Sequence, residues 1–346
     1  MYSLTSLAAF VCLLALASAV GCTDSDSATD DVKGARSPEQ STRDSSSVPT
    51  TDTAHPPIED RFEQKTPSVD VLLIIDDSGA GPDWQLQTAT EIAPLFDKLA
   101  AVHADFHLGV TGASVHRPDI RFCVGKESLS GRLNTGTWID ASTPSPKDAL
   151  SKLVDMGSGA WSCDVPLYVT MLALIEHADG PNQGFHRATA DQHVVYVGRN
   201  DDHAHDDVTT RQVYDYLTAI ADTGAEAKMH AITCVDKVDC LGPARRVGDV
   251  VVQTGGQLID ANQASESKVW ASIIDDIVPE PQLTYDLTER ADATTVEVQI
   301  ERTGGTVDLL SEADGDYSLN PAGGKLTLTT APVPGDVVVV TYLPAP

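Results

Sequence analysis

Short apolar runs alternate with amphipathic segments through the middle of the chain. The clearest run is Val69–Ile75, and Asp76, Asp77 and Ser78 follow it directly. A short, β-branched and nearly continuous apolar run is typical of a strand buried on both faces. Further strands are expected at 105–111, 193–197, 228–234 and 258–260. Because helical patterns lie between these runs, the sequence predicts a mostly parallel central sheet flanked by helices.

The helical segments are expected at 83–101, 147–156, 164–178, 208–223, 241–254 and 265–278. In the first of them, Trp84, Leu86 and Leu95 belong to an apolar stripe with helical spacing. Helical patterns end at Pro279, and strands separated by Gly and Pro turns are expected at 296–300, 307–310, 325–328 and 337–342. Residues 67–279 are therefore predicted to form an α/β domain, and residues 280–346 a small C-terminal antiparallel β domain.

Residues 1–21 have the features of a lipoprotein signal peptide, because they are uncharged, almost wholly apolar and end in Gly21 before Cys22. Cys22 is the residue expected to carry the lipid. Residues 22–66 are rich in Ser, Thr, Asp and Pro, which predicts a disordered acidic tether, since such a segment cannot bury enough apolar surface to fold. The protein is therefore expected to be exported and lipid-anchored in a cell envelope. The alternative is cleavage after Ala19 and secretion.

The charge of the chain limits its partners. It carries 23 lysines and arginines against 51 aspartates and glutamates, a formal net charge of −28. This charge argues against a nucleic acid as partner, since binding to phosphates needs a basic surface. Anionic lipids would repel the folded part, so a membrane is expected to be contacted through the N-terminal lipid only.

Four cysteines, Cys123, Cys163, Cys234 and Cys240, remain once the signal peptide and Cys22 are set aside. An even number in an exported domain predicts disulfides. We expect Cys234 to pair with Cys240, closing a short loop after a strand, and Cys123 to pair with Cys163, joining two loops. A zinc site is the alternative, although no Cys-x-x-Cys spacing occurs.

Two segments resemble the start of a von Willebrand factor A-type (vWA) domain: Val69–Gly81, with the sequence VDVLLIIDDSGAG, and Asp105–Ala113, with the sequence DFHLGVTGA. Within this family, the sequence most resembles the vWA lipoproteins of bacterial cell envelopes. The resemblance covers Pro67 to about Val278. It implies a Rossmann-like vWA domain whose upper loops, at the carboxyl edge of the sheet, bind a partner. The expected function is non-enzymatic, adhesion-type binding of an unknown protein or extracellular-matrix partner.

Adhesive vWA domains hold Mg²⁺ in a metal-ion-dependent adhesion site. Its ligands come from the motif Asp-x-Ser-x-Ser, a later Thr and a later Asp. One coordination position of the Mg²⁺ stays open for a carboxylate of the partner. The resemblance places Asp76 and Ser78 at the first two positions and Ala80 at the third. Val165 stands at the Thr position and Arg199 at the last Asp position. The resemblance therefore implies a degenerate site that binds Mg²⁺ weakly or not at all.

Asp201 or Asp202 would be the substitute ligand in such a site, because both follow Arg199 closely. No cofactor follows from these residues, and a remnant site would take Mg²⁺ or Ca²⁺. The alternative role for Asp76 and Ser78 is a hydrogen-bonding network that closes the loop and caps the following helix.

The loop 200–207 contains further metal-ligating side chains, including His203, His205, Asp206 and Asp207. They resemble part of the His-x-His-x-Asp-His signature of metallo-β-lactamase-type hydrolases, but Val208 replaces the last histidine. The alternatives for this loop are a Ca²⁺ or Zn²⁺ site, a metal-dependent hydrolase, and an acidic loop that caps the next helix. The leading hypothesis is a non-enzymatic binding protein. A hydrolase and a purely structural envelope protein are the alternatives.

Overall fold

A computed structural model describes residues 55–78, 81–116, 128–157, 164–203, 208–236, 243–263, 267–320 and 322–346, with only the backbone at 81–83. The predicted signal peptide, the lipidation site Cys22 and residues 22–54 of the tether lie outside the described residues. The same holds for the following predicted site residues: Ala80, Cys123, Cys163, His205, Asp206, Asp207 and Cys240.

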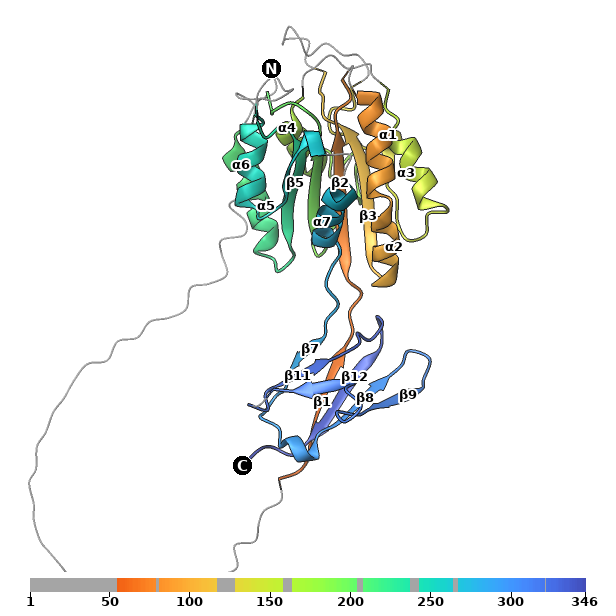
Figure 1. The fold of residues 1–346 in the computed structure, drawn as a ribbon, viewed down its shortest axis with the longest axis vertical. Helices are drawn as coiled ribbons and strands as arrows, with labels where there is room; N and C mark the ends of the chain where they lie inside the picture. Colours follow the sequence, from red (N-terminus) through yellow and green to blue (C-terminus); the bar gives the residue numbers. More distant parts are fainter. Residues whose placement is uncertain are drawn as a thin grey trace, which may run out of the picture. The chain divides into compact units, whose positions relative to one another are not determined.

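A parallel sheet of five strands forms the centre of the α/β domain (Figure 1). Its spatial order is β3 (Asp105–Gly112), β2 (Ser68–Ile75), β4 (Asp191–Val197), β5 (Ala227–Thr233) and β6 (Leu258–Asp260). Each neighbouring pair in this sheet is parallel, as the alternation of apolar runs and helical segments predicted. β2 lies inside the sheet between β3 and β4, which explains its continuously apolar sequence.

The helices of this domain are α1 (Gly81–Ile92), α2 (Pro94–Ala101), α3 (Pro146–Val154), α4 (Pro166–Met171), α5 (Thr210–Ala221), α6 (Arg245–Gln253) and α7 (Ser267–Ile277). The single helix expected at 83–101 is wrong, because Pro94 cannot continue a helix and instead begins α2. Leu86 was also misplaced on the apolar stripe, since its side chain is 66% exposed. None of the helices in the described part of the chain combines the length and apolar character needed to cross a bilayer.

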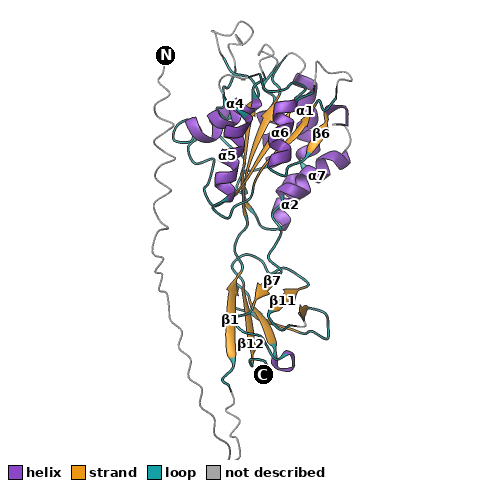
Figure 2. Ribbon diagram, turned by 90° about the vertical axis from the view of Figure 1, so that its left-hand side faces the viewer, coloured by secondary structure: helices purple, strands orange, loops and turns teal. Residues whose placement is uncertain are grey.

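The two faces of β2 pack against different helices (Figure 2). Leu72 and Ile74 belong to an apolar core that includes side chains of α4, α5 and α6. Val71, Leu73 and Ile75 belong to a second core with side chains of α1, α2, α3 and α7. Burial on both faces fixes the register of β2 and therefore the position of the residues that follow it.

A second domain consists of two antiparallel sheets. One has the order β1 (Ile58–Glu63), β12 (Val337–Tyr342), β8 (Glu297–Glu301) and β9 (Val307–Leu310). The other has the order β10 (Tyr317–Leu319), β11 (Lys325–Leu328) and β7 (Thr284–Asp286). Side chains from both sheets share one apolar core, so the sheets pack face to face.

The predicted tether is wrong at its C-terminal end, because residues 58–63 form strand β1, which pairs along its whole length with β12. The inward positions of β1 are Ile58, Asp60 and Phe62, and the charged Asp60 hid this alternation in the sequence. Its carboxylate is satisfied inside the domain, where the Tyr342 hydroxyl donates to it at 2.8 Å. The β domain therefore has strands on both sides of the α/β domain in the sequence, and the α/β domain is inserted between β1 and β7.

Both connections to the β domain leave the α/β domain at the amino end of the parallel sheet. Ser68 is the first residue of β2. At the C-terminal end of α7, Asp276 binds Lys228 near the start of β5, with 2.6 Å between Oδ1 and Nζ. The loops at the carboxyl ends of the strands therefore lie at the opposite end of the α/β domain from both connections.

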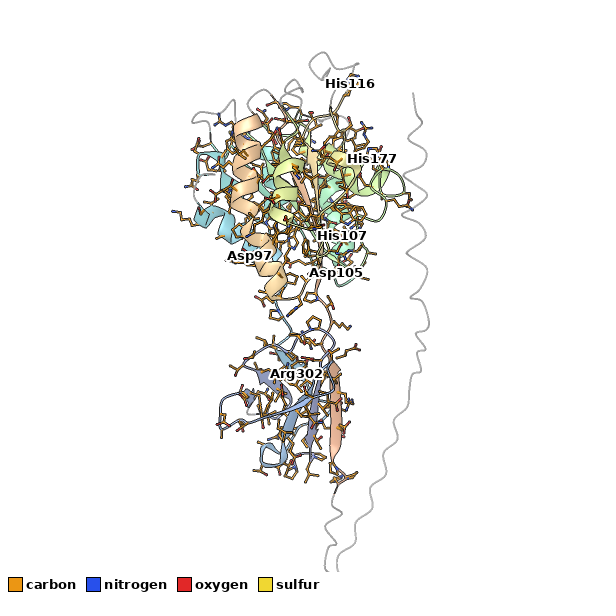
Figure 3. All side chains as sticks on the ribbon, turned by 90° about the vertical axis from the view of Figure 1, so that its right-hand side faces the viewer. Asp97, Asp105, His107, His116, His177 and Arg302 are labelled. Carbon is orange, nitrogen blue, oxygen red and sulfur yellow. The ribbon has the colours of Figure 1, made fainter. Side chains whose placement is uncertain are left out.

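A buried carboxylate, Asp70, lies near the amino end of β2. Arg187 donates to it from Nε at 2.8 Å and from the backbone N–H at 2.6 Å. Asp105 Oδ2 binds Nη1 of the same guanidinium at 2.5 Å, and His107 Nδ1 lies 3.7 Å from Asp70 Oδ1. Asp105 and His107 are both on β3 and are labelled in Figure 3. Burial raises the pKa of Asp70, although Arg187 opposes the shift. Arg187 thus supplies the compensating charge for a carboxylate inside the fold.

Candidate functional site

Four buried aspartates meet at the carboxyl edge of the parallel sheet. Asp76 and Asp77 follow β2, Asp202 follows β4, and Asp164 precedes α4. The charges of the other three all raise the pKa of Asp164, which places them close to it. The structure thus brings Asp76 and the start of the 200–207 loop to one edge, as expected for residues that follow neighbouring parallel strands.

Asp76 closes the loop that follows β2. Its Oδ1 accepts a hydrogen bond from the backbone N–H of Ser78 at 2.8 Å. Its own N–H donates to the carbonyl of Val197 at the end of β4, also at 2.8 Å. One oxygen of Asp76 is therefore committed to the loop, which is the network role predicted as the alternative to metal binding.

Asp77 joins the loops after β2 and β3. Its Oδ2 accepts from the hydroxyl of Ser114 at 2.7 Å, and its Oδ1 accepts from the Ser114 N–H at 3.1 Å. A Cβ at Gly112 would clash with this carboxylate, which explains the glycine at the end of β3. Burial, and to a smaller extent Asp76, raises the pKa of Asp77.

Asp164 is fully buried and only partly satisfied. Its Oδ2 accepts from the side-chain amide of Asn200 at 2.6 Å, whereas Oδ1 has no hydrogen-bond partner in the described structure. Burial, followed by the charge of Asp76, raises the pKa of Asp164 to about 8. At neutral pH the carboxyl is therefore mostly protonated, and the proton neutralises charge that a cation would otherwise have to neutralise.

Asp201 and Asp202 serve as helix caps. Asp201 accepts from the backbone N–H groups of Arg246 (3.0 Å) and Val247 (3.1 Å) in the first turn of α6. Asp202 accepts from the N–H of Leu167 (2.8 Å) in the first turn of α4. Both oxygens of Asp201 thus accept from helix N–H groups, and its role as a substitute metal ligand stays a prediction.

The described residues do not fit a Mg²⁺ site. Among them, no group of three His, Cys, Asp or Glu side chains is arranged to hold a metal ion. Val165, at the predicted threonine position, is buried in an apolar core and offers no oxygen side chain. The described residues of this edge therefore do not present a grouped set of protein ligands for Mg²⁺, which binds through oxygen atoms in octahedral geometry.

Arg199 takes the place predicted for the last carboxylate ligand. Its side chain is exposed, and its guanidinium lies over the ring of Trp84 on α1, with 5.1 Å between the guanidinium carbon and the ring centroid. None of the ion pairs between described residues involves Arg199, so it does not pair with Asp76. The described part of this edge therefore presents an exposed cation that lies over an aromatic ring.

His203 is the one histidine of the predicted metal loop within the described residues. Its Nδ1 and its backbone N–H both lie 3.1 Å from the carbonyl oxygen of Asp164. These contacts hold the start of the 200–207 loop against the segment that precedes α4. His205, Asp206 and Asp207 lie outside the described residues, so the hydrolase alternative stays a prediction.

Cys234 follows β5, is buried and is disulfide-bonded. The other three predicted disulfide cysteines lie outside the described residues. The pairing of Cys234 with Cys240 and of Cys123 with Cys163 therefore stays a prediction.

Comparisons with known proteins give no family. No family model matches the sequence, and no curated protein matches it. Among the solved structures that match are the following two. Proximal thread matrix protein 1 from the mussel byssus has a TM-score of 0.40 and 12% identity over 66% of this chain and 52% of its own. The pilus adhesin SpaC from Lactobacillus rhamnosus GG, in its open conformation, has a TM-score of 0.37 and 11% identity over 83% of this chain and 40% of its own.

This chain thus spans about half of the first protein and two fifths of the second. Identities this low say nothing about what this chain binds.

Sequence reasoning missed Asp164 and the pairing of Asp77 with Ser114. Asp164 comes two residues before Pro166, which begins the short helix α4. The position of Asp164 could have indicated its role. Residues just before a helix that packs on a parallel sheet lie at the carboxyl edge of that sheet, and Asp164 is such a residue. The contact of Arg199 with Trp84 had no signal in the sequence, because the two residues lie on segments far apart in the chain.

Proposed function

We propose that this protein is a non-enzymatic, envelope-anchored binding protein of the vWA type. The loops at the carboxyl edge of its parallel sheet bind a protein partner, and they do so without a metal ion. The observation that carries the proposal is the exposed Arg199 guanidinium, which follows β4 at this edge and lies over Trp84.

Arg199 can provide what a metal ion provides in an adhesive vWA domain. A metal with an open coordination position attracts a carboxylate of the partner. A guanidinium presents a planar set of N–H donors that binds a carboxylate through two parallel hydrogen bonds. Contact with Trp84 restricts the side chain before binding, so less conformational entropy is lost when the partner binds. The partner is therefore expected to present an acidic side chain to Arg199.

The aspartates around this edge support a site that needs no cation. Asp201 and Asp202 are committed to helix N–H groups, and Asp77 is committed to Ser114. Asp164, with its pKa raised to about 8 by burial and by Asp76, is mostly neutral at pH 7. The charge that faces the partner then belongs to Arg199.

Both connections to the β domain leave the α/β domain at the end opposite these loops, which leaves the loops clear of the two linking segments. Lipidation at Cys22 and a tether behind it would hold this domain at a membrane. We propose export and anchoring because residues 1–21 resemble a lipoprotein signal peptide and residues 22–66 were predicted to be a tether.

Capture from an envelope extract tests this function. The full mature chain is immobilised, incubated with extract of the producing cells in the presence of a chelator, and the retained proteins are quantified by mass spectrometry. We expect a partner that the wild type retains and that Arg199→Glu retains about tenfold less or worse, because a central arginine at an interface contributes about 2 kcal/mol.

Arg211→Glu is the matched control. Arg211 is also exposed and also lies over an aromatic ring, that of Tyr214, at 5.4 Å, but it is on α5 outside the edge. The Arg211→Glu variant should retain the partner as the wild type does. Equal retention by Arg199→Glu, retention that the chelator abolishes, or no specific retention by the wild type would each contradict the proposal.

A further inference from the structure

One edge of the β domain is open. β9 is the last strand in the order β1, β12, β8, β9, so one side of it has no neighbouring strand among the described residues (Figure 1). The side chains of Val307 and Leu309 are 52% and 79% exposed, whereas Leu310 packs against the core of the domain. Because side chains alternate along a strand, Val307 and Leu309 share the outer face of the sheet. β9 therefore combines an open edge with an exposed apolar surface.

The backbone of β9 directs four hydrogen-bonding groups toward this edge. The N–H of Arg302 donates to the carbonyl of Thr306 at 2.8 Å, which makes these residues a hydrogen-bonded pair of the β8–β9 hairpin. Such pairs alternate along an antiparallel ladder, so Asp308 is the next residue of β9 that bonds to β8. Val307 and Leu309 are at the positions in between, and their N–H and C=O groups therefore point away from β8.

The open stretch is short because both of its ends are closed. At one end, the hairpin turn brings the N–H of Gly305 to the carbonyl of Arg302 at 2.8 Å. At the other end, the N–H of Ser311 donates to the carboxylate of Asp316 at 2.9 Å, and the N–H of Asp316 donates to the carbonyl of Ser311 at 3.1 Å. The stretch that can pair with another strand therefore consists of residues 307–309.

The other edge of the same sheet is protected by charge. β1 presents Glu59, Arg61 and Glu63 on its outer face, and all three are exposed. Charged side chains on an edge strand disfavour the addition of a further strand. β9 instead has Val307 and Leu309 on this face, so the sheet is protected at one edge and open at the other.

We propose that the β9 edge pairs with the β9 edge of a second copy of this chain. The two strands are antiparallel, and a twofold axis passes between the two Asp308 residues. In this register Val307 lies opposite Leu309 of the second copy, and Leu309 lies opposite its Val307. All four backbone groups that each copy directs to the edge then form hydrogen bonds. The four apolar side chains form one cluster on the outer face of a continuous sheet.

A second copy fits this edge better than a flexible peptide does. A peptide would lose conformational entropy on ordering and would gain only the few hydrogen bonds that residues 307–309 offer. The β9 strand of a second copy is already ordered by β8. The register brings two Asp308 carboxylates together, but each is paired with Arg302 of its own chain, with 2.7 Å between Oδ2 and Nε. This pairing involves a different domain from the Arg199 edge and does not depend on binding there.

Sedimentation equilibrium tests the pairing. The protein used is the full chain from residue 22 on with Cys22→Ser, so that no lipid can cause association. We expect a reversible monomer–dimer equilibrium with a dissociation constant of about 100 μM, because the interface is small. The net charge is −28, so added salt should screen the repulsion between copies and strengthen the pairing. A protein that is still monomeric at about 1 mM, or an association that weakens with salt, would overturn the proposal.

A lysine on the edge tests whether β9 is the surface that pairs. Leu309→Lys is expected to weaken the dimer about tenfold or more, because a charged side chain then occupies the centre of the apolar cluster. Leu86→Lys, the same change on an exposed leucine of α1, should leave the dimer unchanged. Both side chains are exposed, so both variants are expected to fold. Dimerisation of Leu309→Lys equal to that of the wild type would overturn the proposal.

A disulfide tests the register. Residues opposite each other at a non-hydrogen-bonded position have Cα atoms about 4.5 Å apart, which is within reach of a disulfide. Asp308→Cys is therefore expected to give a covalent dimer on mild oxidation. Asp314→Cys, the same change on an exposed residue of the turn after β9, should give at least about tenfold less. Equal crosslinking of the two variants would overturn the proposal, and so would a wild type that stays monomeric and binds an extended peptide at β9.

Discussion

Replacing Arg187 with methionine is expected to lower the free energy of unfolding by about 3–5 kcal/mol. The change removes the guanidinium that compensates the buried carboxylate of Asp70, at 2.7 Å between Nη2 and Oδ1, while the carboxylate stays inside the fold. An uncompensated buried charge is costly because the interior cannot solvate it as water does. Chemical denaturation followed by circular dichroism measures the change.

Two further variants separate this cause from the loss of a surface charge. Arg211→Met removes an exposed guanidinium that pairs with Asp215 on the same helix, and it should cost less than about 1 kcal/mol. Asp70→Val combined with Arg187→Met removes both charges, and it should recover most of the lost stability. A cost for Arg187→Met no larger than that for Arg211→Met would show that Asp70 does not depend on Arg187.

The second large effect is expected from pH. His193 on β4 and His230 on β5 are both buried, with 3.1 Å between His193 Nδ1 and His230 Nε2. The N–H of Gln257 donates to His230 Nδ1 at 3.2 Å, so Nε2 of His230 carries the proton that it shares with His193. This chain of hydrogen bonds uses both rings in the neutral form. Protonation of both rings would place two cations in contact between neighbouring strands.

Burial, and next the charge of His230, lowers the pKa of His193 well below its usual range. Burial lowers the pKa of His230 to about 4, although Asp276 opposes the shift and Lys228 adds to it. Between pH 6.5 and 4 the unfolded chain therefore binds protons at these histidines that the folded chain does not. The stability that neutral histidines provide is fully present above pH 6.5 and is lost as the pH falls through this window.

We therefore expect the free energy of unfolding to fall by about 3 kcal/mol between pH 6.5 and pH 4 from His230 alone. The buried aspartates with raised pKa values act in the opposite direction, so the test compares two proteins. Unfolding of the wild type and of His193→Gln combined with His230→Gln is measured across this pH range. The difference in stability should favour the wild type near pH 7 and shrink by this amount at pH 4. A difference that does not change with pH would contradict the account.

The layers of the fold could be predicted because their signal is local. The run Val69–Ile75 can be buried on both faces only inside a parallel sheet, and the helical segments between strands supply those two faces. β1 could not be predicted, since Asp60 occupies an inward position whose cost is removed by Tyr342 from the far end of the chain. Local patterns do not reveal compensation by distant residues.

The sequence predicted where the candidate site lies but not the contacts that its residues make. Residues after parallel strands must meet at one edge, and Asp76 does meet Asp202 and Asp164 there. Which helix N–H groups each carboxylate would cap depends on how α4 and α6 approach the edge, and the sequence contains no signal for that approach. The same holds for the contact between Arg199 and Trp84.

The central claim is that the carboxyl edge functions without a metal ion, and calorimetric titration of metal-stripped protein with Mg²⁺, Mn²⁺ and Ca²⁺ tests it most directly. The account predicts no one-to-one binding at the edge, because Asp76 is committed to its loop, Asp201 to α6, and Val165 offers no oxygen ligand. A one-to-one site of micromolar affinity that Asp76→Ala abolishes would contradict it.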